Sequence, residues 1–406
     1  MREIVHIQIG KAGNAAGLKF WEAVCEEHGI NPSGTYIGQN DNQLEKINVY
    51  FHENLREKFI PRAVAFDLDP ASVEDVFWSK YGRLFKRRNL VCGSRKGTEN
   101  NWARGFYTEG RKLAGFVLDS IRREAEKCDC LDGFQIVHSL GGGTGSGLGS
   151  YVMGVLRQEY PTRCLSAYSI FPSPDIIVDR IQTYNAVMGL QHVTEYSVQT
   201  YCMDNFALEH ICEKFLEVPK AGFNAMNYLI STAMAAITTT NRLPGHLNEG
   251  VIKSSINMIP FPRLQFLTPG FAPICPEGTN VIRTLEELKS DMMDSQNIFI
   301  YPPNEGKYLT ASYIIRGLVP QMEIDLLMSQ MFKKNWNKYV KWLPDNKKYV
   351  VCPVPLRGIK LSAAMVGNTT GIKTVFSRIL EFFDVIQEEK NYIHWLTGEY
   401  RRHPSC

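Results

Sequence analysis

The sequence predicts an α/β fold in which a parallel, Rossmann-like sheet is joined by a central helix to a second α+β domain and a residual C-terminal helix. Two observations predict this. In the first half, short β-branched runs that end in glycine or acidic loops alternate with amphipathic helical patterns. In the second half, a long apolar helical run is followed by strand patterns of alternating polarity.

The first half contains repeated units of a strand, a loop and a helix. We expect strands over residues 4–9, 62–66, 134–138 and 164–171, and helices over residues 14–27 and about 148–159. The strands end in glycines, in aspartates or at Pro172. Because the carboxyl ends of parallel strands meet at one edge of a sheet, we expect these loops to form a common ligand site there.

The second half begins with a helical pattern of apolar residues over about residues 224–240, and we expect such a largely apolar helix to be buried between two domains. Strand patterns over residues 264–271, 312–318 and 348–355 and a helical pattern over 371–386 predict an α+β domain. We therefore expect three parts, residues 1–205, 206–381 and 382–406, of which the last is too short to fold alone.

Composition excludes several classes of protein. The 406 residues carry 45 Lys and Arg against 42 Asp and Glu, and basic groups such as Lys86-Arg87-Arg88 lack interleaved aromatic residues, which argues against nucleic-acid binding. No apolar run approaches the roughly 18 residues of a membrane span. Ten cysteines without a CxxC pair, and no secretory sequence at the start, favour reduced thiols in a cytoplasmic protein.

Residues 141–147, Gly-Gly-Gly-Thr-Gly-Ser-Gly, give the strongest local signal. Five glycines in seven positions, after a strand and before a helix, leave backbone N–H groups free to bind an anion beside the positive end of the helix dipole. The loop predicts a phosphate site, and a flexible turn is the alternative. It is neither a Walker A loop, because no Lys-Ser/Thr pair follows, nor a GxGxxG motif.

Other loops at the same predicted edge supply further candidates. They are residues 10–14, residues 97–101 and the pair Asp67 and Asp69, whose carboxylates suit a magnesium ion. A helix-capping turn is the alternative interpretation of Asp67-Leu68-Asp69-Pro70.

Four segments together resemble tubulin, closest to its β subunit. They are Met-Arg-Glu-Ile-Val-His-Ile-Gln at residues 1–8, the glycine loop at 141–147, Asn-Met-Ile-Pro-Phe-Pro-Arg at 257–263 and His-Trp-Leu-Thr-Gly-Glu at 394–399. The resemblance covers essentially the whole chain. It implies a GTP-binding subunit of cytoplasmic filaments, in which subunits stack head to tail and each nucleotide is covered by the next subunit.

The resemblance also implies GTP or GDP and Mg²⁺ as cofactors, with the metal held by Asp67 and Asp69. Asn205 and Asn227 would read the guanine edge, and Phe223 would stack on the base where the family usually has a tyrosine. The cofactor-binding residues implied in this way are Gly10, Lys11, Asn14, Glu99, Asn100, Ser139, Gly142, Gly143, Thr144, Gly145, Ser146, Asp179, Gln182, Asn205, Phe223 and Asn227.

Several of these positions differ from the family pattern. Lys11 replaces a glutamine of the first loop, and we expect its ammonium to contact the β- or γ-phosphate; a lysine directed into solvent is the alternative. Glu99 replaces a glycine, and its carboxylate would repel a γ-phosphate unless it is protonated, turned away or metal-bound. Val178 and Gln182 replace acidic residues at the ribose, where the adjacent Asp179 could compensate.

The expected contacts with neighbouring subunits also differ. Lys253 lies where an α subunit supplies the glutamate that positions water, so the chain is expected to contribute no catalytic residue of its own, and an ion pair is the expected role of Glu249. In the lateral loop, Glu277 reverses the charge of an arginine common in β subunits. After Glu399 the family continues into a helical hairpin and an acidic tail, so reduced binding of tail-dependent motors and associated proteins is expected.

The leading hypothesis is a β-tubulin-like, GTP-binding structural subunit of microtubules. It would pair head to tail with an α-tubulin-like partner, polymerise with other tubulin subunits and have slow GTPase activity that assembly completes. A non-polymerising, nucleotide-binding regulator or decoy derived from tubulin is the alternative. A dinucleotide-dependent dehydrogenase is disfavoured by the missing GxGxxG motif.

Overall fold

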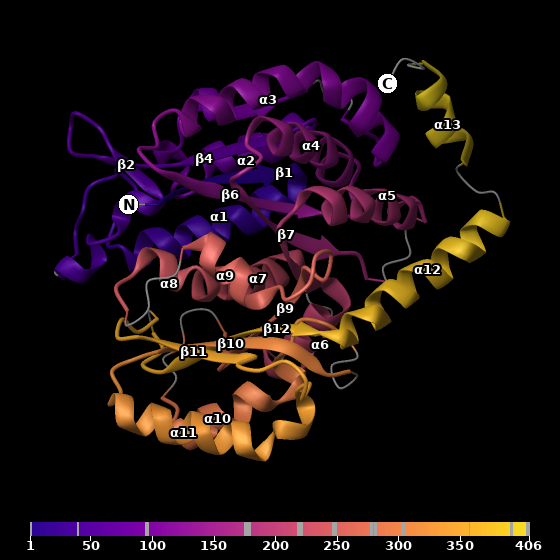
Figure 1. The fold of residues 1–406 in the computed structure, drawn as a ribbon. Helices are drawn as coiled ribbons and strands as arrows, with labels where there is room; N and C mark the ends of the chain where they lie inside the picture. Colours follow the sequence, from indigo (N-terminus) through magenta and orange to yellow (C-terminus); the bar gives the residue numbers. More distant parts are fainter. Residues whose placement is uncertain are drawn as a thin grey trace.

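A ten-stranded sheet runs through the whole molecule (Figure 1). The computed structural model describes residues 2–38, 40–93, 97–173, 180–216, 222–245, 250–276, 279, 282–301, 306–356, 358–389 and 393–402. The strand order is β11-β10-β12-β9-β8-β7-β6-β1-β4-β5. A separate two-stranded hairpin consists of β2 (Phe51–Glu53) and β3 (Phe59–Pro61).

The strands that the first half contributes to the large sheet are all parallel, as predicted. They are β1 (Glu3–Ile9), β4 (Ala63–Asp67), β5 (Leu90–Cys92), β6 (Leu131–Ser139), β7 (Cys164–Phe171) and β8 (Gln199–Asp204). The middle strands are buried on both faces, which explains why they appear in the sequence as nearly continuous apolar runs.

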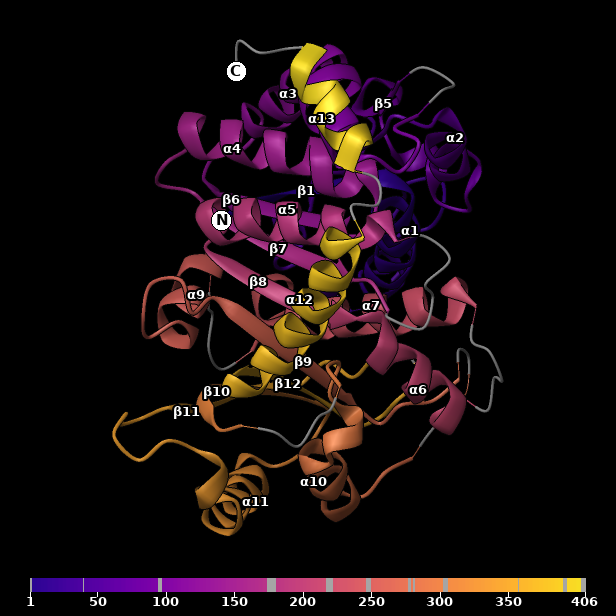
Figure 2. The same ribbon diagram turned by 90° about the vertical axis from the view of Figure 1, so that its right-hand side faces the viewer.

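Helices cover both faces of this sheet (Figures 1 and 2). One core contains α3 (Glu109–Ala125), α4 (Gly149–Glu159), α5 (Ile181–Tyr196) and α12 (Lys373–Glu388). The other contains α1 (Gly10–Glu27), α2 (Pro70–Trp78), α6 (Asn205–Phe215), α7 (Phe223–Ile237) and α9 (Val251–Met258). Along β1, Val5 and Ile7 pack into the first core and Ile4 into the second, as the two-residue period of a strand requires.

The second half extends the same sheet rather than forming a separate one. Strand β9 (Phe266–Ala272) pairs in parallel with β8, and β12 (Ser362–Thr369), β10 (Tyr308–Arg316) and β11 (Lys347–Cys352) follow. Helices α10 (Leu285–Met293) and α11 (Gln321–Lys334) cover this part. The predicted α+β character is confirmed, because β12 is antiparallel to both of its neighbours.

The predicted central helix is present as α7, followed by the short α8 (Thr239–Arg242). It packs against α1 on one side and against β9 and β12 on the other, which confirms that it is buried between the two halves. Helices α3, α10 and α11 were not predicted.

The last described helix, α13 (Ile393–Arg402), packs against residues Arg104–Thr108 before α3. Figure 2 shows α13 crossing the end of α3. In the part of the chain that the structure describes, none of the helices has the length and apolar character needed to cross a membrane.

Candidate functional site

A cavity of about 950 Å³ opens at the carboxyl edge of the parallel strands. The first residues beyond β1 and β8, Gly10 and Asn205, line it together with the last residues of β4 and β6, Asp67 and Ser139. This is the position that the sequence predicted from the loops after each strand. The cavity is large enough for a nucleotide-sized ligand, since such sites occupy about 300–1,000 Å³.

The cavity brings together most of the residues predicted to bind a cofactor. Those that line it are Gly10, Lys11, Glu99, Asn100, Ser139, Gly142, Gly143, Thr144, Gly145, Gln182, Asn205, Phe223 and Asn227, with Asp67 and Asp69. Asn14 and Ser146 lie behind the wall, where the Asn14 amide donates to Ser72 Oγ at 2.7 Å and Ser146 Oγ donates to the Asn185 carbonyl at 2.7 Å. Val178 and Asp179 lie outside the described residues.

The glycine loop passes directly from β6 into a π-helical turn, Gly143–Leu148, and then into α4. At Gly143 a Cβ atom would lie 2.6 Å from Thr98 Oγ1, and at Gly145 it would lie 2.7 Å from the Ser139 carbonyl oxygen, so packing excludes larger residues there. Gly142 is different, because no atom lies within 4 Å of its Cβ position. Packing therefore does not require a glycine at position 142, but a side chain there would take up space in the cavity.

Two buried residues that sequence reasoning missed hold this loop in place. Asn185 of α5 donates to the carbonyls of Gly141 and Asn100, both at 2.8 Å, and accepts from the Trp102 amide. His138 of β6 lies 3.0 Å from the Gly145 carbonyl and 2.8 Å from Ser169 Oγ. For His138 the available signal was a polar residue inside the apolar run of a predicted strand, whereas the helix that carries Asn185 was not predicted.

His138 is neutral in this arrangement. Burial lowers its pKa to about 4, and the carbonyl of Gly145 can only accept, so Nδ1–H donates to it while Nε2 accepts from the Ser169 hydroxyl. The imidazole therefore fixes the orientation of a loop peptide without adding charge beside the cavity.

The two aspartates have different environments. Asp69 caps α2, because its Oδ1 accepts from the Ala71 amide at 3.2 Å, so the capping interpretation holds for this residue. Asp67 is buried, and burial raises the pKa of its carboxyl although Ser72 and Thr144 donate to it. A desolvated carboxylate at the cavity wall would be stabilised by a cation.

The donor set fits magnesium rather than a metal held by protein alone. No group of three or more His, Cys, Asp or Glu side chains in the described ranges could hold a metal ion. Mg²⁺ commonly uses only one or two carboxylates and completes its shell with waters and phosphate oxygens. Asp67 and Asp69 at the cavity wall match that requirement.

Glu99 is turned away from the glycine loop. It adopts a left-handed backbone conformation with φ of 49°, and its carboxylate forms an ion pair with Arg104. Arg104 also lies 3.8 Å from Glu399 of α13, and the Asn101 amide donates to the Trp395 carbonyl. The arginine thus neutralises the charge that was expected to repel a γ-phosphate, and it connects the third loop to the C-terminal helix.

The far end of the cavity can hold a planar group. Phe223, the first residue of α7, is 63% exposed, and the amide-bearing Asn205 and Asn227 lie in the same wall. Asp204, and not Asn205, supplies the cap of α6.

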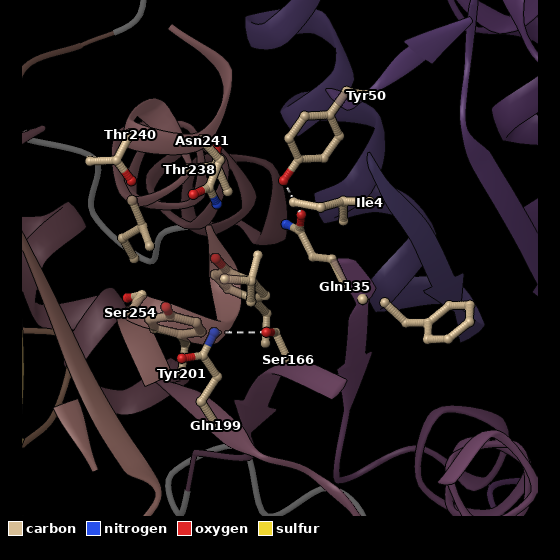
Figure 3. Close-up of a pocket in the computed structure, with 15 residues that line it drawn as sticks. Ile4, Tyr50, Gln135, Ser166, Gln199, Tyr201, Thr238, Thr240, Asn241 and Ser254 are labelled. Carbon is tan, nitrogen blue, oxygen red and sulfur yellow. Dashed lines mark hydrogen bonds between the residues drawn. The ribbon is translucent and has the colours of Figure 1, made fainter. Parts of the chain in front are cut away.

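A second cavity, at the opposite ends of the strands, is much smaller (Figure 3). Its volume is about 20 Å³, which is enough for about one water molecule. Tyr50 donates to Gln135, and Gln199 donates to Ser166 at 2.7 Å across it. We therefore assign the ligand site to the larger cavity.

Comparisons with known proteins agree with this geometry. Residues 3–213 match the Tubulin/FtsZ family, GTPase domain, and residues 262–381 match the Tubulin C-terminal domain. The chain is 46% identical to the Tubulin beta chain of Bombyx mori over 402 residues, which cover 98% of this chain and 89% of that protein.

Proposed function

The chain belongs to the Tubulin/FtsZ family, and from this premise we propose that it is a β-tubulin-like subunit that pairs head to tail with an α-type partner and polymerises into microtubules. As a member of this family it is a cytoplasmic, cytoskeletal protein that uses GTP or GDP with Mg²⁺. The observation that supports the proposal most directly is the cavity that gathers the glycine loop, two aspartates and an exposed aromatic ring at one sheet edge.

The cavity walls suit the parts of a guanosine polyphosphate. In our proposal the glycine loop binds the phosphates through backbone N–H groups at the start of α4. Phe223 stacks on the base, and the amides of Asn205 and Asn227 donate to and accept from its polar edge. A magnesium ion on Asp67 and Asp69 would neutralise phosphate charge.

Lys11 adds a positive charge that the family pattern lacks. It is the second residue of α1, it is exposed, and it lines the cavity beside the glycine loop. We propose that its ammonium donates to the β- or γ-phosphate as a point charge and so reduces the dependence of binding on magnesium.

The chain is expected to provide no catalytic group for its neighbour. Lys253 is exposed on α9, where the family's α subunit has a glutamate. Glu249, the nearest carboxylate in sequence, lies outside the described residues, as do Glu277 and Gly278 of the lateral loop. In our proposal, hydrolysis of GTP in this chain's own cavity requires a glutamate of the next subunit, so isolated protein should hydrolyse GTP slowly.

The face around α9 offers a surface for the α-type partner. Large apolar side chains are exposed there, with fractions of 70% for Ile256, 44% for Phe261, 46% for Leu264 and 62% for Trp342. The ring centres of Phe261 and Trp342 lie 5.9 Å apart, so these two side chains are adjacent. An exposed apolar group of this kind is typical of a surface that is covered in an assembly.

Two finer expectations remain proposals. The division into residues 1–205, 206–381 and 382–406 is proposed for the functional parts, although the sheet runs through the first two. The reduced binding of tail-dependent motors and associated proteins stays a prediction.

The proposal is tested by nucleotide binding and by sedimentation. Purified chain should bind GTP and GDP but not ATP, and should pellet with a purified α-type subunit and GTP. Binding of GTP without magnesium should weaken in the Lys11→Ala variant by about tenfold, because one charge-assisted hydrogen bond is lost. Magnesium-free binding that is unchanged in this variant would refute the role of Lys11.

The same experiment separates the alternative function. Nucleotide binding without pelleting would identify a non-polymerising regulator. A well-folded preparation that binds no guanine nucleotide would remove the basis of both functions.

A further inference from the structure

A lysine-rich surface lies between α11 and β11, far from the nucleotide cavity. We define it as residues 333–348, which contain six lysines, Lys333, Lys334, Lys338, Lys341, Lys347 and Lys348, against one carboxylate, Asp345. The whole chain has a net charge of only +3, so the rest of the chain is net negative. The first four lysines are exposed and the last two are half-buried. The segment ends in β11, the edge strand of the sheet (Figure 2).

Several of these lysines are not neutralised within the chain. No described carboxylate lies within ion-pair distance of Lys333, Lys334, Lys341 or Lys347, whereas the exposed Lys112 pairs with Glu109 at 2.8 Å. Lys333 and Lys334 stabilise the carboxyl end of α11 through its dipole, but Lys341 and Lys347 lie beyond the helix. The surface therefore presents uncompensated positive charge to a partner.

The segment departs from the expectation that basic groups of this chain lack interleaved aromatic residues, yet the chain's own lysines lie over two of its three aromatic rings. Lys341 Nζ lies 4.2 Å from the centre of the Trp336 ring, and Lys347 Nζ lies 4.3 Å from that of Tyr339. These ring faces are covered by the chain's own cations, and Tyr339 is buried. Single-stranded nucleic acids bind to several uncovered aromatic faces, whereas here the exposed Trp342 ring is the third and lies beside Phe261, so the chemistry favours carboxylates.

The surface is continuous with the face proposed for head-to-tail stacking. Trp342 belongs to the lysine-rich segment and contacts Phe261, which follows α9. We propose that the lysine-rich surface binds an aspartate- and glutamate-rich segment of the subunit that stacks on this face. The identity of the bound segment rests on the proposed function. The positive charge of the surface and the lysines over its rings are observed independently of that function.

The direct test uses the full chain and a fluorescent decaglutamate peptide at 50 mM NaCl. The variant Lys333→Gln/Lys334→Gln/Lys341→Gln should bind the peptide about tenfold more weakly than the unmodified chain, and added salt should weaken binding by the unmodified chain more steeply. The control Lys58→Gln/Lys112→Gln/Lys373→Gln removes the same charge from exposed positions elsewhere and should change the affinity less than twofold. No binding by the unmodified chain, or an equal loss in both variants, would overturn the inference.

Competing ligands decide between classes of partner. A ten-residue oligothymidylate, or phosphatidylserine vesicles, should bind no more tightly than the peptide and should show no greater loss in the lysine variant. Tighter binding of either ligand with a greater loss would overturn the inference in favour of a nucleic acid or a membrane surface.

Measurements with the α-type subunit separate this inference from the proposed function. The lysine variant should retain GTP affinity but lose about tenfold in affinity for the subunit at low salt. A chain that binds GTP and pairs normally, but in which the lysine variant loses no affinity for peptide or subunit, contradicts the inference alone. Peptide binding that depends on these lysines, in a chain that never binds the subunit, contradicts the proposed function and the assignment of the occupant.

Discussion

Gly142 offers the sharpest test of the phosphate site, because the fold itself does not require a glycine there. Its φ of −88° is accessible to alanine, and no atom lies within 4 Å of the Cβ position. The residue nevertheless lines the cavity. A methyl group at this position would occupy the space in which a phosphate approaches the backbone N–H groups.

The Gly142→Ala variant should therefore fold well and bind nucleotide poorly. Reduced freedom of the unfolded chain stabilises an unstrained alanine by about 0.4–1 kcal/mol. Loss of one hydrogen bond to a charged phosphate costs about 1.5–3 kcal/mol, which corresponds to a roughly ten- to hundredfold weaker affinity for GTP.

Urea unfolding and equilibrium binding of a fluorescent GTP analogue measure the two effects. Gly115→Ala is the matched control. Gly115 is an exposed residue of α3, it also has no atom within 4 Å of its Cβ position, and it does not line the cavity. The control should be stabilised and should bind GTP normally. Normal GTP affinity in the stable Gly142→Ala variant would show that phosphates do not approach this loop.

Three further predictions concern charges. Glu27 is buried between two arginines, so Glu27→Gln should lower the free energy of unfolding by about 3–5 kcal/mol in urea titrations; a loss below 1 kcal/mol would contradict this. The native pKa of His138, about 4, lies below the unfolded value near 6.5, so the contribution of this residue to stability is present at pH 7 and is lost as pH falls from 6.5 towards 4. The loss in the free energy of unfolding should be about 2 kcal/mol at pH 5. A His138→Gln variant with the same acid sensitivity would exclude His138 as the source. Arg104→Gln should release the Glu99 carboxylate and weaken GTP binding several-fold relative to GDP binding. Adding Glu99→Gly to this variant should restore the affinity for GTP. If the affinity is not restored, the effect belongs to Arg104 itself.

The position of the site could be predicted from local sequence, because the residues that follow each strand can be recognised from the sequence pattern. Once β1, β4 and β6 are recognised as parallel, Gly10, Asp67 and the glycine loop must meet at one edge. The helical period of its apolar residues located the central helix.

The sequence by itself determined the parallel sheet, the glycine loop and the candidate residues around it, because these depend on periodicity and on backbone freedom at consecutive positions. Only the tertiary structure decided which side chains support that loop. Asn185 donates to the Asn100 carbonyl across 85 residues of sequence and to the Gly141 carbonyl of the glycine loop, and no local pattern encodes either contact. The continuation of the sheet from β8 to β9 was likewise decided by long-range pairing, since hydrogen bonds between strands distant in sequence form only when the packed helices bring their edges together.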